Sequence, residues 1–224
     1  MNEIINNIAV FALPVLFAIT LHEAAHGYVA RYFGDNTAFA AGRVSLDPFK
    51  HIDLFGTIIL PIVMYVSSAA IGNPFLFGYA KPVPVDFGRL RNPKRDMIWV
   101  AFAGPGANFF MALLWLLMLV GLQAGHFNEK FFVEMANAGV VTNLVLFALN
   151  LFPIPPLDGG RILVGLLPLK QAMQFAKVEP YGFFIVIVLS MMNGLLFRYW
   201  IYPVVDISMS ILNTIVSPLT SLLN

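Results

Sequence analysis

The longest apolar stretches of this sequence approach the length that a helix needs to cross a lipid bilayer. Such a crossing takes about 20 predominantly apolar residues, and the stretches run over residues 4–33, 54–71, 97–123, 131–151 and 181–202. Charged residues make up only 11% of the 224 residues, whereas a soluble domain carries about 25% because water must hydrate its surface. The sequence therefore predicts an all-α polytopic membrane protein, a helix bundle of about five to six membrane segments.

Composition also excludes several classes of function. The net charge is only +1, and no cluster of Lys and Arg interleaves with aromatic residues, so no nucleic-acid partner is expected. The absence of cysteine excludes disulfides and thiolate metal sites. No linker or repeat divides the chain. We therefore predict a single domain over residues 1–224, with its core at about 5–165 and further C-terminal membrane helices over 181–223.

His22, Glu23 and His26 form the pattern His-Glu-x-x-His inside the first apolar stretch. Residues four apart lie on one face of a helix, about 6 Å apart along its axis, so both imidazoles can bind one ion. A chance match is the alternative, but ionisable side chains within a membrane segment are costly unless they have partners or a function. The pattern therefore predicts a metal site, with Glu23 close enough to take a proton from the attacking water.

Asp158 is the favoured third ligand. Two histidines leave a catalytic zinc site one protein ligand short, since such sites usually have three. Asp158 follows a spanning segment that is broken by three prolines between residues 153 and 156, and two glycines come after it. Unwinding there would let a short carboxylate project inward. An ordinary turn is the alternative, because Pro-Leu-Asp-Gly-Gly is also good turn chemistry.

Two motifs in this order resemble those of the site-2 protease family of intramembrane zinc metalloproteases. The first is His22-Glu-x-x-His26, and the second is the run from Asn150 to Arg161, which reads Asn-Leu-Phe-Pro-Ile-Pro-Pro-Leu-Asp-Gly-Gly-Arg. The run Ala-Gly-Pro-Gly-Ala-Asn that ends at Asn108 is similar to the start of a family helix, and residues 42–57 resemble the short bacterial and archaeal members. The resemblance covers residues 20 to 165 or thereabouts.

The resemblance implies an intramembrane zinc endopeptidase. It implies one Zn²⁺ ion, bound by His22, His26 and Asp158, and Glu23 as the base that activates water. Family substrates are transmembrane helices of membrane proteins, cut near the cytoplasmic side. No stretch is long and soluble enough for a PDZ or CBS domain, so substrate selection by such a domain is not expected.

The resemblance also suggests substrate contacts and partners. Asn150 and Pro153 match family positions near the substrate path, and Asn108 is a weaker candidate. The implied partners are transmembrane-helix substrates and the lipid bilayer, and no pattern specifies an oligomeric state. A different class of function uses the same His/Asp cluster: a non-proteolytic membrane protein that transports or senses a metal. That class does not need Glu23 between the histidines.

The ligands constrain the topology, because all three must meet at one depth in the membrane. The first apolar stretch and residues 131–151 must then run in the same direction, with residues 97–123 opposite. Residues 34–96 must accordingly begin and end on the same side, so we predict a re-entrant segment or hairpin over 54–80, near the active site. Residues 37–50 are too polar to span and suggest a short β-hairpin or loop. The positions of Lys and Arg predict an N-terminus outside the cell membrane and an active site towards the cytoplasm.

Overall fold

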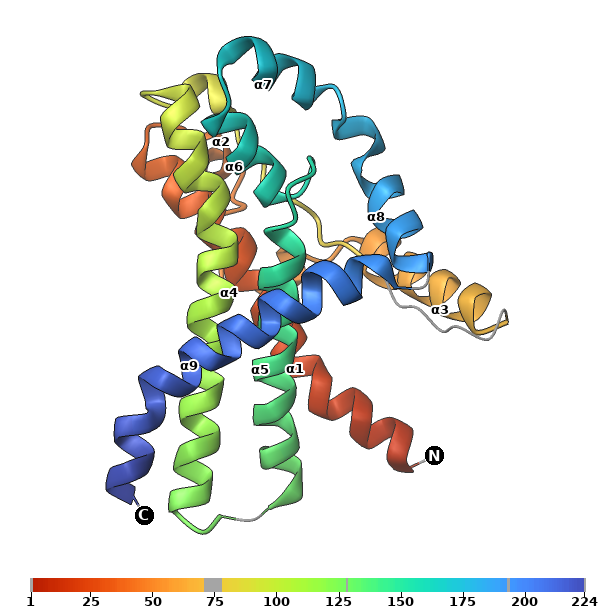
Figure 1. Cartoon of the computed structure of the whole chain (residues 1–224), viewed down its shortest axis with the longest axis vertical. Helices are drawn as coiled ribbons and strands as arrows, with labels where there is room; N and C mark the ends of the chain where they lie inside the picture. Colours follow the sequence, from red (N-terminus) through yellow and green to blue (C-terminus); the bar gives the residue numbers. More distant parts are fainter. Residues whose placement is uncertain (1, 71–77, 128, 193, 224) are drawn as a thin grey trace.

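Three long helices form the centre of the molecule in a computed structural model, which describes residues 2–70, 78–127, 129–192 and 194–223. They are α1 (Asn2–Tyr32), α4 (Pro93–Ala124) and α5 (Lys130–Asn150). All three are apolar around their whole circumference, as expected of helices that face both lipid and one another. Each of the three is in extensive contact with the other two (Figure 1).

The remaining elements are shorter helices and helical turns. In chain order they are α2 (Thr37–Ala40), the turns Pro48–Lys50 and Leu54–Ile59, α3 (Leu60–Ala70), the turn Phe87–Arg89, α6 (Asp158–Leu166), α7 (Leu169–Ala176), the turn Glu179–Tyr181, α8 (Gly182–Met191), the turn Phe197–Ile201 and α9 (Tyr202–Leu223). Every regular element in the described residues is helical. Of the hairpin and the loop predicted for residues 37–50, the loop is found, and it contains α2 and one helical turn.

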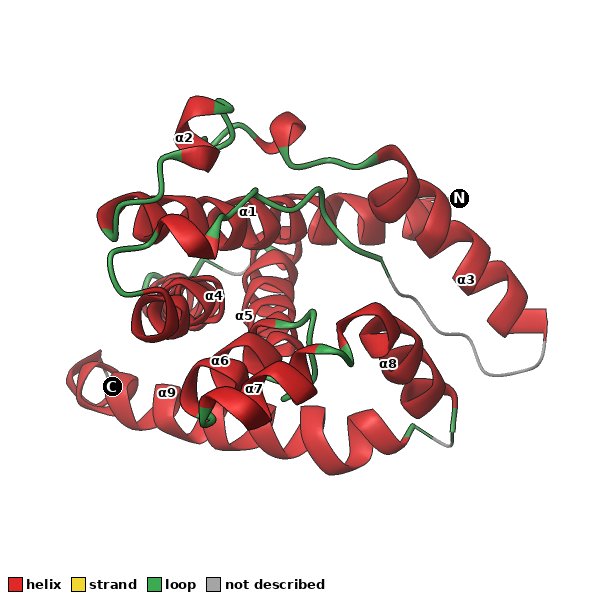
Figure 2. Ribbon diagram, turned by 90° about the horizontal axis from the view of Figure 1, so that it is seen from above, coloured by secondary structure: helices red, strands yellow, loops and turns green. Residues whose placement is uncertain are grey.

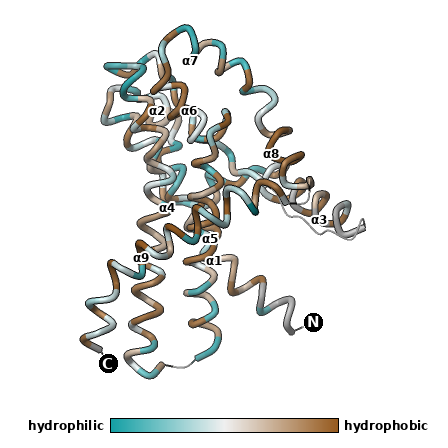
Figure 3. Tube along the Cα trace, in the orientation of Figure 1, coloured by the Kyte–Doolittle hydropathy of each residue, from teal (hydrophilic) through white to brown (hydrophobic). Residues whose placement is uncertain are grey.

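Five helical segments are long and apolar enough to cross a membrane. They are Ile8–Tyr32, Pro93–Ala124, Lys130–Asn150, Leu169–Met191 and Phe197–Leu222. Figure 3 shows hydrophilic residues gathered around α2 and α7, at one end of the bundle. The predicted all-α polytopic membrane fold is confirmed.

The directions of the three long helices meet the requirement set by the predicted ligands. Helices α1 and α5 run in the same direction and α4 runs in the opposite one (Figure 1). Helices α4 and α5 approach closely at Gly139, where an added Cβ atom would lie 2.2 Å from the indole ring of Trp115. Small residues allow such close crossings between membrane helices. Val10 of α1 and Leu212 of α9 are buried in the same apolar core.

Residues 54–70 lead away from the bundle, and residues 78–81 lie beside the start of this segment. Helix α3 projects to the side in two perpendicular views (Figures 1 and 2). At the base of this projection the N–H of Tyr79 donates to the carbonyl of Gly56 (2.9 Å), and the N–H of Lys81 donates to the carbonyl of His51 (2.9 Å). The two ends of the segment therefore lie together, as the topology requires. Of the re-entrant segment or hairpin predicted over 54–80, residues 71–77 lie outside the described residues.

Asp35, just after α1, ties the end of this helix to the segment that returns. It is fully buried, and its carboxylate accepts hydrogen bonds from the hydroxyl (2.5 Å) and N–H (2.9 Å) of Thr37 and from the N–H of Asp86 (2.8 Å). Burial alone would raise the pKa of this carboxyl, but the hydrogen bonds from Thr37 and Asp86 outweigh it and hold the pKa below its ordinary value of 3.8.

We expect Asp35→Asn to destabilise the fold, because an amide cannot accept all three hydrogen bonds. The free energy of unfolding should fall by about 1–3 kcal/mol. Thermal unfolding in detergent, followed by tryptophan fluorescence, would measure this change. The pKa of Asp35 is lower in the folded state than in the unfolded state. The extra stability of the wild-type protein over the variant is therefore present above pH 3.8 and should be lost as the pH falls below that value. Asp206→Asn, at an exposed position of α9, is the control, and an equal effect of both substitutions would contradict the prediction.

Candidate metal centre

Three polar side chains from α1 and α6 meet inside the bundle. The Nε2 atoms of His22 and His26 lie 3.0 Å apart. The Oδ2 atom of Asp158 lies 3.2 Å from Nε2 of His22 and 3.3 Å from Nε2 of His26. All three residues are buried. In the part of the chain that the structure describes, this is the one group of three or more His, Cys, Asp or Glu side chains arranged to hold a metal ion.

Hydrogen bonds set the tautomers of both histidines. The Nδ1 atom of His26 lies 2.7 Å from the carbonyl oxygen of Val100, which can only accept, so this nitrogen carries the proton. The Nδ1 atom of His22 lies 2.6 Å from Oδ1 of Asn108 and likewise donates. In their neutral forms both rings therefore direct the Nε2 lone pair, the atom a metal would bind, towards the same point.

The donor set fits a zinc ion. A tetrahedral site with ligand distances of about 2.0–2.1 Å places neighbouring ligand atoms about 3.3 Å apart, close to the separations of 3.0, 3.2 and 3.3 Å observed here. Oδ2 of Asp158 is buried and has no hydrogen-bond partner. Two nitrogen lone pairs and a carboxylate oxygen at such distances repel one another unless a cation lies between them. Nitrogen and oxygen ligands of this kind suit Zn²⁺.

Helix α4 leaves room for these side chains because residue 104 is glycine. A Cβ atom added to Gly104 would lie 2.3 Å from Nε2 of His26 and 2.6 Å from Nε2 of His22. The backbone of α4 therefore forms one wall of the site, directly against the Nε2 atoms of the two histidines. The same helix supplies the Val100 carbonyl and the Asn108 amide on either side of this glycine.

The loop after α5 packs tightly against the first turn of α6 and so positions Asp158. A Cβ atom on Gly159 would lie 2.1 Å from the carbonyl oxygen of Leu151, and one on Gly160 would lie 2.0 Å from the backbone nitrogen of Pro155. The bond between Pro155 and Pro156 is cis. Asp158 is the first residue of α6, so the break that the prolines predict precedes the carboxylate, which itself lies on a helix.

Glu23 lies next to the cluster of His22, His26 and Asp158 but is not a member of it. Its side chain is half-buried, and its Oε2 accepts a hydrogen bond of 2.8 Å from the backbone N–H of Val83. Val83 is buried and lies in a stretch without regular secondary structure, between two prolines. A carboxylate that is next to the ligands and held by a hydrogen bond can act as a base towards water in the site.

The residues predicted to contact substrate lie in two places. Asn150 is the last residue of α5 and donates from Nδ2 to the carbonyl of Leu146 (3.0 Å). Pro153 lies in the loop that leads to Asp158, and both residues are half-buried. Asn108 is completely buried and hydrogen-bonds His22. For all three positions substrate contact stays a prediction.

Sequence reasoning missed three contributions to the site. The carbonyl of Val100 leaves no trace in the sequence, because every residue has one. Gly104 lies in the recognised run before Asn108, but its role depends on how closely α4 approaches α1. Asn143 hydrogen-bonds Asn108 (3.1 Å), and its only signal is an amide side chain within an apolar segment.

We expect Gly104→Ala to weaken zinc binding, because the added methyl group would occupy space against both Nε2 atoms. Isothermal titration of the purified protein with Zn²⁺ in detergent should show an affinity at least tenfold lower, in the range of strong effects on metal sites. Gly106→Ala is the matched control, since a Cβ atom there would meet only Phe102 at 3.5 Å. Equal zinc affinity of the two variants would rule out this role for Gly104.

Comparison with known proteins identifies the family. The model of peptidase family M50 matches residues 10–138 and 128–193. "Putative zinc metalloprotease YwhC" of Bacillus subtilis (strain 168) is 35% identical over 186 residues, which cover 79% of this chain and 78% of that protein. "Putative zinc metalloprotease Rip2" of Mycolicibacterium smegmatis is 31% identical over 206 residues, which cover 88% and 73%.

No solved structure matches this chain. The family match spans most of the sequence and includes α1, which carries two members of the buried group, and α6, which carries the third. The chain therefore belongs to peptidase family M50, the site-2 protease family, and is a zinc metalloendopeptidase.

Proposed function

We propose that this zinc metalloendopeptidase cuts peptide bonds within or next to transmembrane helices of membrane-protein substrates, using His22, His26 and Asp158 as zinc ligands and Glu23 as the base. The observation that carries the proposal is the position of the buried group. His22 and His26 lie on the membrane-crossing segment Ile8–Tyr32, and their nitrogens touch α4 at Gly104, well inside the segment Pro93–Ala124. A substrate bond must then reach the site at membrane depth.

The protein groups have distinct tasks in this reaction. When bound, zinc supplies a Lewis acid that polarises the scissile carbonyl and lowers the pKa of water to about 7. The Nδ1 hydrogen bonds of His22 and His26 keep their Nε2 atoms available as ligands. Glu23 takes the proton from the attacking water and passes it to the leaving amine. The N–H of Val83 fixes one oxygen of this carboxylate, so the other oxygen remains for the proton.

We expect Glu23→Gln to retain zinc and to lose cleavage, because glutamine cannot take up a proton. General base catalysis contributes about 10²–10⁴-fold, so cleavage of a co-purified single-span membrane substrate should fall by at least about 100-fold. Mass spectrometry of the products should place the cut within or beside the transmembrane helix, and elemental analysis should find one zinc per chain. Glu129→Gln, exposed at the far end of the bundle, is the control.

Normal cleavage by the Glu23→Gln variant would contradict this mechanism. Zinc flux into proteoliposomes in the absence of any cleavage would instead favour the transport or sensing function that the same cluster allows.

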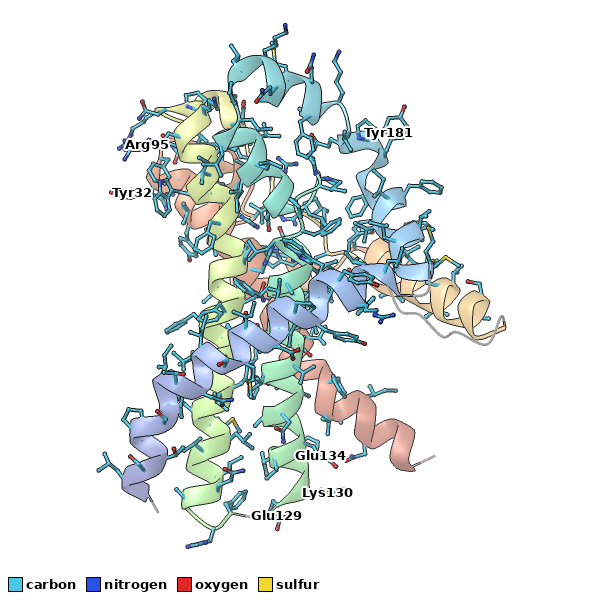
Figure 4. All side chains as sticks on the ribbon, viewed as in Figure 1. Tyr32, Arg95, Glu129, Lys130, Glu134 and Tyr181 are labelled. Carbon is cyan, nitrogen blue, oxygen red and sulfur yellow. The ribbon has the colours of Figure 1, made fainter. Side chains whose placement is uncertain are left out.

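We also propose that the end of the bundle holding Arg95 and α7 faces the cytoplasm. Figure 4 shows Tyr32 and Arg95 at one end, with Glu129, Lys130 and Glu134 at the other. Most of the positive charge lies in the segments between α1 and α4 and after Asp158. It is carried by Arg31, Arg43, Lys50, Lys81, Arg89, Arg91, Lys94, Arg95, Arg161, Lys170 and Lys177. Loops rich in Lys and Arg remain on the cytoplasmic side of bacterial membranes, so the N-terminus of α1 would lie outside.

Cysteine labelling can test this orientation, since the chain contains no cysteine of its own. In intact cells, a membrane-impermeant maleimide should label Lys130→Cys, and it should label Lys170→Cys only after the membrane has been opened. Both positions are exposed, so the protein itself should not prevent the reagent from reaching either cysteine. The reverse pattern would show the opposite orientation.

A further inference from the structure

Two asparagines lie completely buried where α1, α4 and α5 meet, and they form a continuous chain of hydrogen bonds that ends on His22. Asn143 of α5 donates from Nδ2 to the carbonyl of Gly139 (2.8 Å). Its Oδ1 accepts from Nδ2 of Asn108 (3.1 Å), which also donates to the carbonyl of Ala18 (3.1 Å). Oδ1 of Asn108 then accepts from Nδ1 of His22 (2.6 Å). Neither asparagine has any exposed surface.

The direction of this chain follows from its backbone end. The carbonyl of Gly139 can only accept, so the group of Asn143 that faces it must be the NH₂ group. The oxygen of Asn143 must then face Asn108, whose own NH₂ group points to it and to the carbonyl of Ala18. The oxygen of Asn108 is left for His22, whose Nδ1 must carry the proton. The Nε2 lone pair of His22 is thereby directed into the zinc site.

We propose that Asn143 is a positioning residue for the zinc site: it holds the Asn108 amide in the one orientation that keeps the Nε2 atom of His22 unprotonated. The proposal rests on the use of His22 as a ligand in the proposed function. Asn143 acts through Asn108 and does not touch the metal or the substrate. Outer groups of this kind orient metal-binding histidines and change metal affinity by about 10–100-fold.

The contrast with His26 explains why His22 needs such a chain. His26 donates to a backbone carbonyl, that of Val100, which cannot present a hydrogen. An asparagine amide has a donor and an acceptor of nearly the same shape. If Asn108 turned over, its NH₂ group would face Nδ1 of His22, the proton would move to Nε2, and the ligand atom would be blocked. The oxygen of Asn143 and the carbonyl of Ala18 both oppose this turn.

The cost of burying Asn143 also indicates a role beyond packing. Its side chain lies in the apolar segment Lys130–Asn150, among residues where an alkyl side chain would be less costly, since polar groups within the membrane need internal partners. Asn137, on the same helix, makes the same kind of bond to the carbonyl four residues earlier (2.9 Å) but is exposed. It provides a matched control for loss of an asparagine from α5.

The test measures zinc affinity and histidine tautomer in the purified full-length protein in detergent. Asn143→Leu should bind Zn²⁺ about 10–100-fold more weakly in competition with a chelator, whereas Asn137→Leu should bind like the wild type. In the metal-free protein, ¹⁵N spectra of labelled histidine should show His22 protonated at Nδ1, and Asn143→Leu should lose this preference. Asn143→Ser keeps a donor for Gly139 and an acceptor for Asn108, so it should retain more affinity than Asn143→Leu.

A double-mutant comparison separates positioning from packing. In an Asn108→Ala background, Asn143→Leu should cause no further loss of zinc affinity, because the group it orients is gone. A further loss of the same size, or wild-type affinity and tautomer in the Asn143→Leu protein, would overturn the proposal. If His22→Ala itself bound Zn²⁺ as tightly as the wild type, the ligand assignment in the proposed function would fail instead.

Discussion

Two imidazole lone pairs and a carboxylate oxygen that lie 3.0–3.3 Å apart inside an apolar bundle impose a strict condition on everything around them. Without a cation the three groups repel one another, and lipid offers no water to separate them. The surrounding structure must therefore bring all three to one point at which a cation can bind. The cluster of His22, His26 and Asp158 thus accounts for features of the fold that apolar packing alone would not require.

Each of the three proposed ligands is held by a different means. His26 is fixed by the backbone of α4, and His22 by a side chain of the same helix. Asp158 is fixed by the loop after α5, whose carbonyls and prolines pack against two adjacent glycines. Helix α4 reaches both histidines only because Gly104 leaves out a side chain at the point of contact. The antiparallel α4 is therefore the wall and the orienting element of a site whose proposed ligands all come from other helices.

Local properties of the sequence were enough to predict much of this arrangement. Low charge and long apolar runs predicted the membrane bundle, and the spacing of His22 and His26 placed both on one face of a helix. The requirement that Asp158 meet them at one depth predicted the helix directions and the paired ends of residues 54–80. The roles of Gly104 and Asn143 depend on distances between helices, which sequence periodicity does not contain. The only sequence feature that could have indicated a role for Asn143 was its amide side chain within an apolar segment.

The proposed base depends on a different part of the molecule from the metal ligands. Glu23 is held by the N–H of Val83, which is the sole backbone donor of residues 82–84 because both of its neighbours are proline. That stretch is held in turn by Asp35 at Asp86 and by Arg43, which donates to the carbonyl of Lys81 (2.9 Å). The three long helices and the loop before α6 position the proposed metal ligands, whereas the polar segments between α1 and α4 position the proposed base. We therefore expect that substitutions can change zinc affinity and cleavage separately.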